Sequence, residues 1–302
     1  MSSSYIGRFA PSPTGPLHFG SLLAALASYL DARSQNGQWF VRIEDLDPPR
    51  EDPHAADQIL HILDAYQLYW DGEVRYQSQR HDAYQAALES LKQSGHAFPC
   101  GCSRKQLAGQ LHQGRCSLPD NLRQAGDYAW RFCIGSGERS FIDGLQGEYR
   151  ESLHNDIGDF VVKRRDGPWS YQLAVVVDDA DQHISHVVRG IDLIDSTIRQ
   201  QCLQQALGFP LPHYSHIPVA VESNGQKLSK QNLATALQAD ESGNTLWDAL
   251  LWLRQSPPTD LRHCGNEAVL TWAITHWQPH PLAGIQQNPA PLDFLRHNET
   301  RP

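Results

Sequence analysis

The sequence predicts an α/β fold with a parallel sheet, a small metal-binding insertion and a helical C-terminal region. Three observations indicate this fold. The first 45 residues show a strand, loop, helix and strand in that order, three of six cysteines fall between residues 100 and 116, and apolar residues at helical spacing dominate from about residue 245. A chain of 302 residues is long enough for about two structural units and a sizeable core.

The first elements form a strand–helix–strand unit. Residues 6–10 are predicted as a strand that runs into the Pro- and Gly-rich loop at 11–16, after which leucines repeat at helical spacing over 22–30. Residues 39–43 predict the second strand, which ends in the acidic cluster at 44–47. Such a unit implies a parallel pair of strands, and ligands bind at the carboxyl ends of such strands.

The later elements continue this alternation. Helices are expected at 55–66, 81–94, 246–253 and 268–273, and strands at 160–164, 171–177 and 184–190. The segment 171–177 contains three consecutive valines, so we expect it to be a buried central strand.

Charge and composition exclude several classes of protein. A net charge of -9 argues against binding through a general basic coat, although a local basic patch is still compatible with it. The N-terminus lacks a basic segment followed by an apolar one, and no run of about 18 apolar residues occurs. We expect a cytoplasmic protein with no membrane segment.

The loop before the first helix has the features of an ATP site. A helix N-terminus offers free N–H groups and positive potential, His18 can donate to a phosphate oxygen, and Gly20 lets a base or ribose approach the backbone. Taken alone, this pattern fits a structural turn with a capping histidine equally well.

Two lysines, Lys227 and Lys230, follow a turn at Gly225. Only five of the 25 Lys and Arg residues are Lys, so the pair indicates a need for compact point charges near phosphates. Such ammonium groups would neutralise charge that develops on a pyrophosphate leaving group. A solvated surface loop is the alternative interpretation.

The cysteine cluster predicts a structural zinc site. Thiolates at positions i and i+2 can share one metal where the chain turns at Gly101, and tetrahedral zinc needs four ligands. The predicted ligands are Cys100, Cys102, His112 and Cys116. Two alternatives stay open: the cysteines are simply buried without metal, or His96 or Cys133 completes the site.

Five ordered motifs, at residues 8–21, 42–47, 175–179, 187–190 and 227–230, resemble the glutamyl branch of the class I aminoacyl-tRNA synthetases. This resemblance implies a Rossmann-like class I synthetase catalytic domain with an inserted zinc-containing subdomain and a short C-terminal helical region. In the subgroup that these motifs resemble most, a tyrosine usually stands at the position of His112, the predicted fourth zinc ligand.

The resemblance also implies a division of the chain. The expected parts are residues 1–95 as the first half of the catalytic domain, 96–190 as the inserted acceptor-binding and zinc subdomain that returns to the sheet, 191–244 as the second half with the Lys-Leu-Ser-Lys loop, and 245–302 as the helical region. No anticodon-binding domain is expected. This short form resembles a truncated branch that attaches glutamate to the queuosine base in the anticodon of tRNA(Asp).

Three other functions stay open at this point. A minimal glutamyl-tRNA synthetase would charge the 3′ end of its tRNA. A non-catalytic paralogue would bind tRNA or glutamate without activating it, and a more distant enzyme would adenylate a small acid without RNA.

The resemblance implies a glutamate pocket in which cations bind the carboxylates and an anion binds the ammonium group. Arg8 and Arg189 would provide forks for the carboxylates, Glu44 would pair with the amino group, and Tyr171 would add a hydroxyl. The full set of implied glutamate-binding residues is Arg8, Phe9, Ala10, Pro11, Ser12, Glu44, Tyr171 and Arg189.

The implied reaction forms glutamyl-adenylate from glutamate and ATP and then transfers the acyl group to a hydroxyl. Catalysis would rest on positioning and charge stabilisation, with Mg²⁺ accompanying ATP. The implied catalytic residues are His18, Gly20, Lys227 and Lys230, and the implied ATP-binding residues are His18, Gly20, Ser21 and Lys230. The expected partners are L-glutamate, ATP and tRNA(Asp) that carries queuosine, and we expect a monomer.

Overall fold

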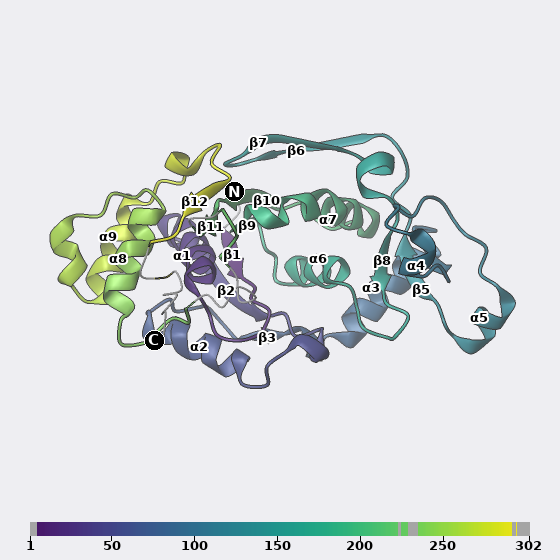
Figure 1. Cartoon of the computed structure of the whole chain (residues 1–302), viewed down its shortest axis with the longest axis horizontal. Coiled ribbons are helices and arrows are strands. Elements are labelled where there is room, and N and C mark those ends of the chain that lie inside the picture. Colours follow the sequence, from purple (N-terminus) through teal and green to yellow (C-terminus); the bar gives the residue numbers. More distant parts are fainter. Residues whose placement is uncertain (1–4, 223–224, 229–234, 292–293, 295–302) are drawn as a thin grey trace, which may run out of the picture.

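The computed structural model describes residues 5–222, 225–228, 235–291 and 294. Its centre is a set of parallel strands in two groups (Figure 1). The first group has the order β1-β2-β3 and the second pairs β9 with β10. The bounds are β1 Ile6–Phe9, β2 Gln38–Ile43, β3 Arg75–Tyr76, β9 His186–Gly190 and β10 His213–Ile217. Ser185 donates to the carbonyl of Ile6 (3.0 Å), so β9 lies beside β1.

Helices cover both faces of these strands. They are α1 Phe19–Ser34, α2 Ala55–Ala65, α3 His81–Gln93, α6 Tyr171–Asp181 and α7 Ile194–Leu207. Successive residues of a strand point to opposite faces, and accordingly Val187 packs in the cluster with α3, α6 and α7, whereas Val188 packs in the cluster with α1 and α2. The strands therefore separate two hydrophobic cores.

The inserted segment forms its own antiparallel sheet, of order β4-β5-β8, and a hairpin of β6 and β7. The bounds are β4 Ala97–Cys100, α4 Arg104–Leu107, α5 Asp120–Ala125, β5 Ala129–Phe132, β6 Glu138–Asp143, β7 Gly147–Ser152 and β8 Phe160–Lys163. The hairpin runs along one long side of the molecule, from the β4-β5-β8 sheet toward the C-terminal helices (Figure 1).

The C-terminal region packs on α1. It contains α8 Ser242–Trp252, α9 Asn266–His276 and β12 Gln287–Pro289, which pairs in parallel with β11 Val219–Val221. Trp252 meets Phe19 of α1 edge to face at 6.4 Å. Short helical turns complete the described elements: η1 Pro48–Arg50, η2 Gln77–Gln79, η3 Leu153–Ile157, η4 Ile191–Leu193, η6 Thr259–His263 and η7 His280–Leu282.

The predicted α/β fold, the parallel pair at the N-terminus and the C-terminal helices are confirmed. The expected strand at 171–177 is wrong, because these residues form most of helix α6. Ser170 caps this helix by accepting from the N–H of Leu173 at 3.3 Å. The segment is buried on nearly every side, so its apolar run has no visible helical period, and a short run of this kind cannot be distinguished from a buried strand.

Among the described residues, no helix combines the length and the apolar character that crossing a membrane requires.

Candidate functional site

A cavity of about 400 Å³ opens at the carboxyl ends of β1, β9 and β10, beside the N-terminus of α1. Most of the predicted site residues line it. These are Arg8, Phe9, Ala10, Pro11, Ser12, His18, Gly20, Ser21, Tyr171, Arg189 and Lys227. Of the two other residues predicted to bind glutamate or ATP, Lys230 lies outside the described residues, and Glu44 is not part of the cavity lining. The cavity thus brings together motifs more than 200 positions apart in the sequence.

The loop between β1 and α1 places a histidine at the start of the helix. His18 is the N-cap of α1, and its Nδ1 accepts from the backbone N–H of Ser21 at 3.4 Å. The imidazole covers Gly20, where a Cβ atom would lie 3.1 Å from His18 Cε1. Gly15 has a φ of 135°, which favours glycine at that bend. The imidazole of His18 and the neighbouring Gly20 together form part of the cavity wall at the N-terminus of α1.

Arg8 belongs to a buried ion network under the cavity. Its Nε donates to Asp179 Oδ1 at 3.3 Å, and the same carboxylate accepts from Arg42 at 2.7 Å. Burial alone would raise the pKa of Asp179, but Arg8 and Arg42 hold it below its usual value. Arg8 hydrogen-bonds to the described residues through Nε only, so its two terminal nitrogens are available to a ligand in the cavity.

Sequence reasoning assigned no role to Asp179 or Arg42. Both residues stand inside recognised motifs, at 175–179 and 42–47, which is the signal that could have identified them. Their partners lie on elements far away in the chain, and spacing along the sequence does not reveal such pairs.

Glu44 follows β2, and its backbone N–H donates to the carbonyl of Pro11 at 3.0 Å. Its carboxylate is 7% exposed and lies 3.4 Å from an Nη of Arg42. Burial raises the pKa of Glu44 to about 6, against the opposing effect of Arg42 and Arg8. Glu44 is therefore a buried carboxylate that is still ionised at neutral pH.

Tyr171 is the first residue of α6, and its side chain lines the cavity. Burial raises the pKa of its phenol, while the nearby Arg189 opposes that rise. Tyr171 therefore offers a neutral hydroxyl, which can donate or accept a hydrogen bond.

The guanidinium of Arg189 in β9 is fixed by hydrogen bonds within the protein. Its guanidinium donates to His216 at 3.0 Å, Gln200 at 2.9 Å, Thr197 at 2.8 Å and the carbonyl of Leu193 at 3.1 Å. A guanidinium has five N–H groups, and the described residues take four of them. One N–H on Nη1 is left for a ligand, so Arg189 offers a single hydrogen bond instead of the expected pair.

Lys227 reaches the cavity from the segment after β11. Its Nζ lies 2.5 Å from Asp192 Oδ2, in an ion pair whose side chains are 48% and 37% exposed. Solvent screens such a pair, so a phosphate in the cavity can compete for the ammonium group.

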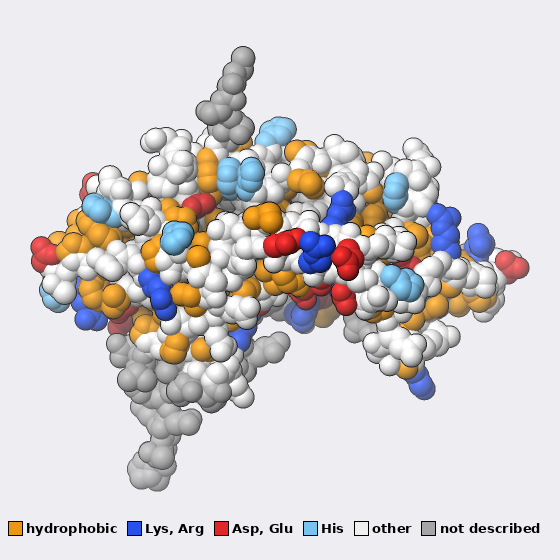
Figure 2. Space-filling model, turned by 90° about the horizontal axis from the view of Figure 1, so that it is seen from above, with side chains coloured by type: hydrophobic (Ala, Val, Ile, Leu, Met, Phe, Trp, Pro, Cys, Tyr) orange, Lys and Arg blue, Asp and Glu red, His pale blue; other side chains and the backbone are white. Residues whose placement is uncertain are grey.

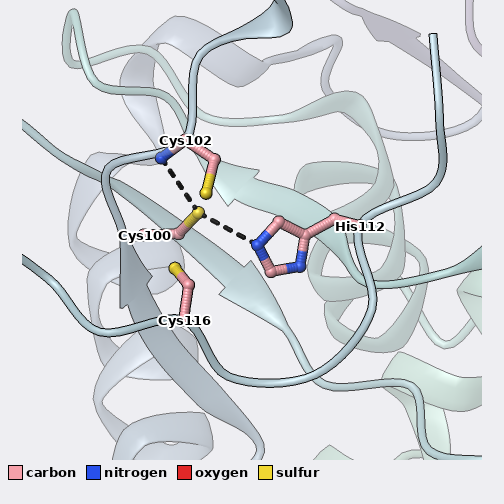
Figure 3. A group of neighbouring side chains, drawn as sticks. All are labelled: Cys100, Cys102, His112 and Cys116. Atoms are coloured by element: carbon pink, nitrogen blue, oxygen red, sulfur yellow. Dashed lines mark hydrogen bonds between the residues drawn. The ribbon is translucent and has the colours of Figure 1, made fainter. Parts of the chain in front are cut away.

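A second cluster lies in the inserted segment, at the end of β4. The ligand atoms of Cys100, Cys102, His112 and Cys116 lie within 4.8 Å of one another, and in Figure 3 the three sulfurs and the imidazole converge. Ligands around one tetrahedral zinc ion, at about 2.3 Å from it, are about 3.8 Å apart. Three thiols and one imidazole are a donor set that suits zinc, so the cluster could hold a metal. Neither His96 nor Cys133 belongs to this group.

Two further residues support this cluster. The Nε2 of His112 lies 3.3 Å from Cys100 Sγ, and its Nδ1 lies 3.3 Å from Asp159. A carboxylate behind a histidine fixes the ring orientation of a metal ligand. Burial would raise the pKa of Cys100, but hydrogen bonds from the Cys102 N–H and from Arg131 lower it, which favours the thiolate. Sequence reasoning missed Asp159 and Arg131.

The surface carries charges of both signs. On the face shown in Figure 2, several Lys and Arg side chains lie toward the end of the molecule that carries α4 and α5. Exposed basic residues of the inserted segment include Lys105, Arg115, Arg123, Arg164 and Arg165. Arg164 and Arg165 pair with Asp166 and Asp127 respectively. Any basic surface on this acidic chain is therefore local.

Comparison with known proteins gives consistent results. The sequence model of the family described as tRNA synthetases class I (E and Q), catalytic domain, matches residues 6–250. A protein of Dechloromonas aromatica named glutamyl-Q tRNA(Asp) synthetase is 52% identical over 289 residues, which are 92% of this chain and 95% of that protein. A protein of Chromobacterium violaceum with the same name is 50% identical over 284 residues, 90% of this chain and 93% of that protein.

Solved structures show the same fold. A glutamate-tRNA synthetase from Elizabethkingia anophelis matches with a TM-score of 0.80 at 22% identity and covers 95% of this chain and 68% of its own. A glutamate tRNA ligase from Elizabethkingia meningosepticum, in complex with its amino acid, matches with a TM-score of 0.81 and covers 96% of this chain and 68% of its own. These structures establish the fold of the chain.

Proposed function

The chain belongs to the class I tRNA synthetases of the glutamyl and glutaminyl type and, among them, to the glutamyl-Q tRNA(Asp) synthetase family, and we propose on this premise that it glutamylates queuosine in tRNA(Asp). ATP activates L-glutamate to glutamyl-adenylate, and the acyl group passes to the queuosine base in the anticodon. The observation that carries this proposal is about 50% identity along 90% or more of both this chain and its relatives.

The cavity supports the activation step. Arg8 presents two terminal nitrogens to one carboxylate of glutamate, and the remaining N–H of Arg189 and the hydroxyl of Tyr171 complete its polar contacts. Glu44, a buried carboxylate that is not part of the cavity lining, would provide negative charge for the ammonium group. The cations and the anion of the pocket match the charges of a dicarboxylic amino acid.

ATP would lie against the N-terminus of α1. His18, Gly20 and Ser21 line the cavity at that helix end, and Lys227 belongs to the same lining. These groups would stabilise the negative charge that develops on pyrophosphate as it leaves. Mg²⁺ accompanies ATP. Lys230 is assigned the same charge-stabilising role as Lys227 by its motif alone.

In this proposal the cysteine cluster binds one structural zinc ion. Zinc would hold β4 and the loop that follows it in one conformation, with Cys100, Cys102, His112 and Cys116 as ligands. The separate β4-β5-β8 sheet lies within the inserted segment proposed at residues 96–190, between the catalytic segments 1–95 and 191–244, and the end of that segment returns to the central strands through α6 and β9. We also propose residues 245–302 as the helical region, a monomeric state and a cytoplasmic location.

The test of the proposed function uses two acceptors. The purified protein is incubated with ATP, Mg²⁺ and radiolabelled glutamate, and either tRNA(Asp) with queuosine or the same tRNA without it. Label on the queuosine form alone is the expected result. Label on neither acceptor, with glutamate-dependent ATP–pyrophosphate exchange still present, would retain the activation site and exclude queuosine as the acceptor.

The second candidate is charging of the tRNA 3′ end. The fold shared with glutamate-tRNA synthetases is the observation that favours it. Periodate treatment of the tRNA destroys the terminal diol but also cleaves the cyclopentenediol of queuosine, so the two acceptors are separated by nuclease digestion instead. Label on the terminal adenosine supports the second candidate, and label on the anticodon fragment supports the first.

A further inference from the structure

His216 lies directly beside Arg189 in the parallel pair of β10 and β9, where the two residues are register partners. The Nε of Arg189 donates to the Nε2 of His216 at 3.0 Å. Both side chains are buried, with His216 fully so. The contact between them is thus shielded from water.

The hydrogen bonds determine which nitrogen of the His216 imidazole carries the proton. Because Nε2 accepts from Arg189, the proton of the neutral ring is on Nδ1, which donates to Asp143 Oδ2 at 2.5 Å. Burial and the charge of Arg189 lower the pKa of His216 more than Asp143 raises it. A protonated ring would also direct an N–H of its own against the N–H of Arg189. His216 is therefore a neutral acceptor toward Arg189.

Asp143 is held in place by the loop that ends strand β6. Its Oδ1 accepts from the backbone N–H groups of Leu145, Gln146 and His216 at 3.0, 2.9 and 3.1 Å. Burial would raise the pKa of Asp143, but its hydrogen bonds and the proximity of His216 hold it below the usual value. The carboxylate is fixed and ionised, so it can hold the imidazole in one orientation.

We propose that His216, oriented by Asp143, is a positioning residue that directs the remaining N–H of Arg189 at a carboxylate of the substrate. This inference rests on the proposed function, because it takes glutamate as the occupant of the cavity. His216 touches neither the substrate nor the reacting atoms. Without an acceptor at Nε2, the guanidinium loses one of the four hydrogen bonds that fix its orientation, the one at Nε, and the hydrogen bond to the carboxylate weakens.

Two substitutions separate positioning from folding. The amide of Gln reaches the location of Nε2, so His216→Gln keeps an acceptor for Arg189. The amide of Asn reaches only the location of Nδ1, so His216→Asn keeps the partner of Asp143 and removes the acceptor. His213→Asn makes the same change on the same strand, at an exposed ring that stacks on His186 and does not contact Arg189.

The experiment measures KM for glutamate and for ATP by ATP–pyrophosphate exchange, and glutamate binding by calorimetry. We expect KM for glutamate to rise about 10-fold in His216→Asn, the usual effect of losing one charged hydrogen bond, with KM for ATP unchanged. His216→Gln should stay within about threefold of the unmodified protein for both substrates, since it retains that hydrogen bond. His213→Asn should match the unmodified protein.

A second readout is taken on the unmodified protein, and a variant serves only to assign the signals. Nitrogen NMR of the unmodified protein should show His216 as a neutral ring protonated at Nδ1, with the signals assigned by their loss in His216→Asn. A ring protonated at Nε2, or equal changes in both KM values for Asn and Gln, would overturn the inference. Absence of glutamate binding in the unmodified protein would instead overturn the proposed function, and this inference with it.

Discussion

Glu44 is a buried carboxylate whose ionisation controls the proposed binding of the substrate ammonium group. Its pKa of about 6, raised by burial, means that it becomes protonated as the pH falls from 7 to 5. We expect KM for glutamate to rise about 10-fold for each pH unit below about 6, because the protonated form offers no negative charge. The measurement is glutamate-dependent ATP–pyrophosphate exchange between pH 5 and 8.

Ionisation of Glu44 should affect the free energy of unfolding in the opposite direction to its effect on glutamate binding. The folded state binds this proton more tightly than the unfolded state does, so ionisation of Glu44 reduces the free energy of unfolding as the pH rises through about 6. Glu44→Gln should therefore be at least as stable at pH 7.5 and yet bind glutamate poorly at every pH. Glu73→Gln, which changes an exposed carboxylate outside the cavity lining, is the control. An unchanged pH profile in Glu44→Gln would contradict the role assigned to Glu44.

At the scale of single residues, the sequence predicts which side chains line the cavity but not which partners hold these side chains in position. His18 and Arg8 were identifiable because both stand in the motif that runs from β1 to the start of α1. Asp179 and Asp143 were not, since their partners Arg8 and His216 lie 171 and 73 positions away. No local spacing encodes such contacts, which form only when α6 packs on the parallel strands and β6 packs against β10.

Among the elements, helix α6 shows why a run of valines can mislead. Valine favours strands by packing on a pleated surface, but that preference depends on context. In α6 the valines pack among α3, α7 and the strands, and that burial outweighs their modest helix penalty. Helices α2 and α3 were recognisable because buried and exposed residues recur in each with a period near 3.6 residues.

The cluster of three cysteines and His112 leads to a prediction about metal affinity. Asp159→Asn should weaken zinc binding about 10- to 100-fold, because it removes the carboxylate that orients His112, and His112→Ala should weaken it further. Zinc content after dialysis against a competing chelator measures both effects. Cys133→Ser, outside the cluster, should retain the metal of the unmodified protein. Equal zinc retention in Asp159→Asn and the unmodified protein would show that Asp159 does not support the site.

At the scale of the whole molecule, one ion network joins α6 to the parallel strands. Arg8 extends from β1 and Arg42 from β2, and both meet Asp179 of α6, with side chains that are at most 5% exposed. The same contacts fix Arg8 at the cavity, so the stability of this face and the geometry of the site depend on one carboxylate.

Asp179→Asn should therefore lower the free energy of unfolding by about 3–5 kcal/mol, since it leaves two buried guanidinium groups without their shared carboxylate. The folded pKa of Asp179 is depressed, so the stability it contributes is present above the unfolded value and is lost as the pH falls below about 4.

Asp181→Asn removes a partly exposed partner of Arg80 from the end of the same helix and should cost no more than about 1 kcal/mol. Urea unfolding of both variants at pH 7 and pH 4 measures the difference. Equal losses at pH 7 would mean that the buried network does not hold α6 on the sheet, whereas a loss confined to Asp179→Asn, accompanied by weaker glutamate binding, would tie fold and site to the same residue.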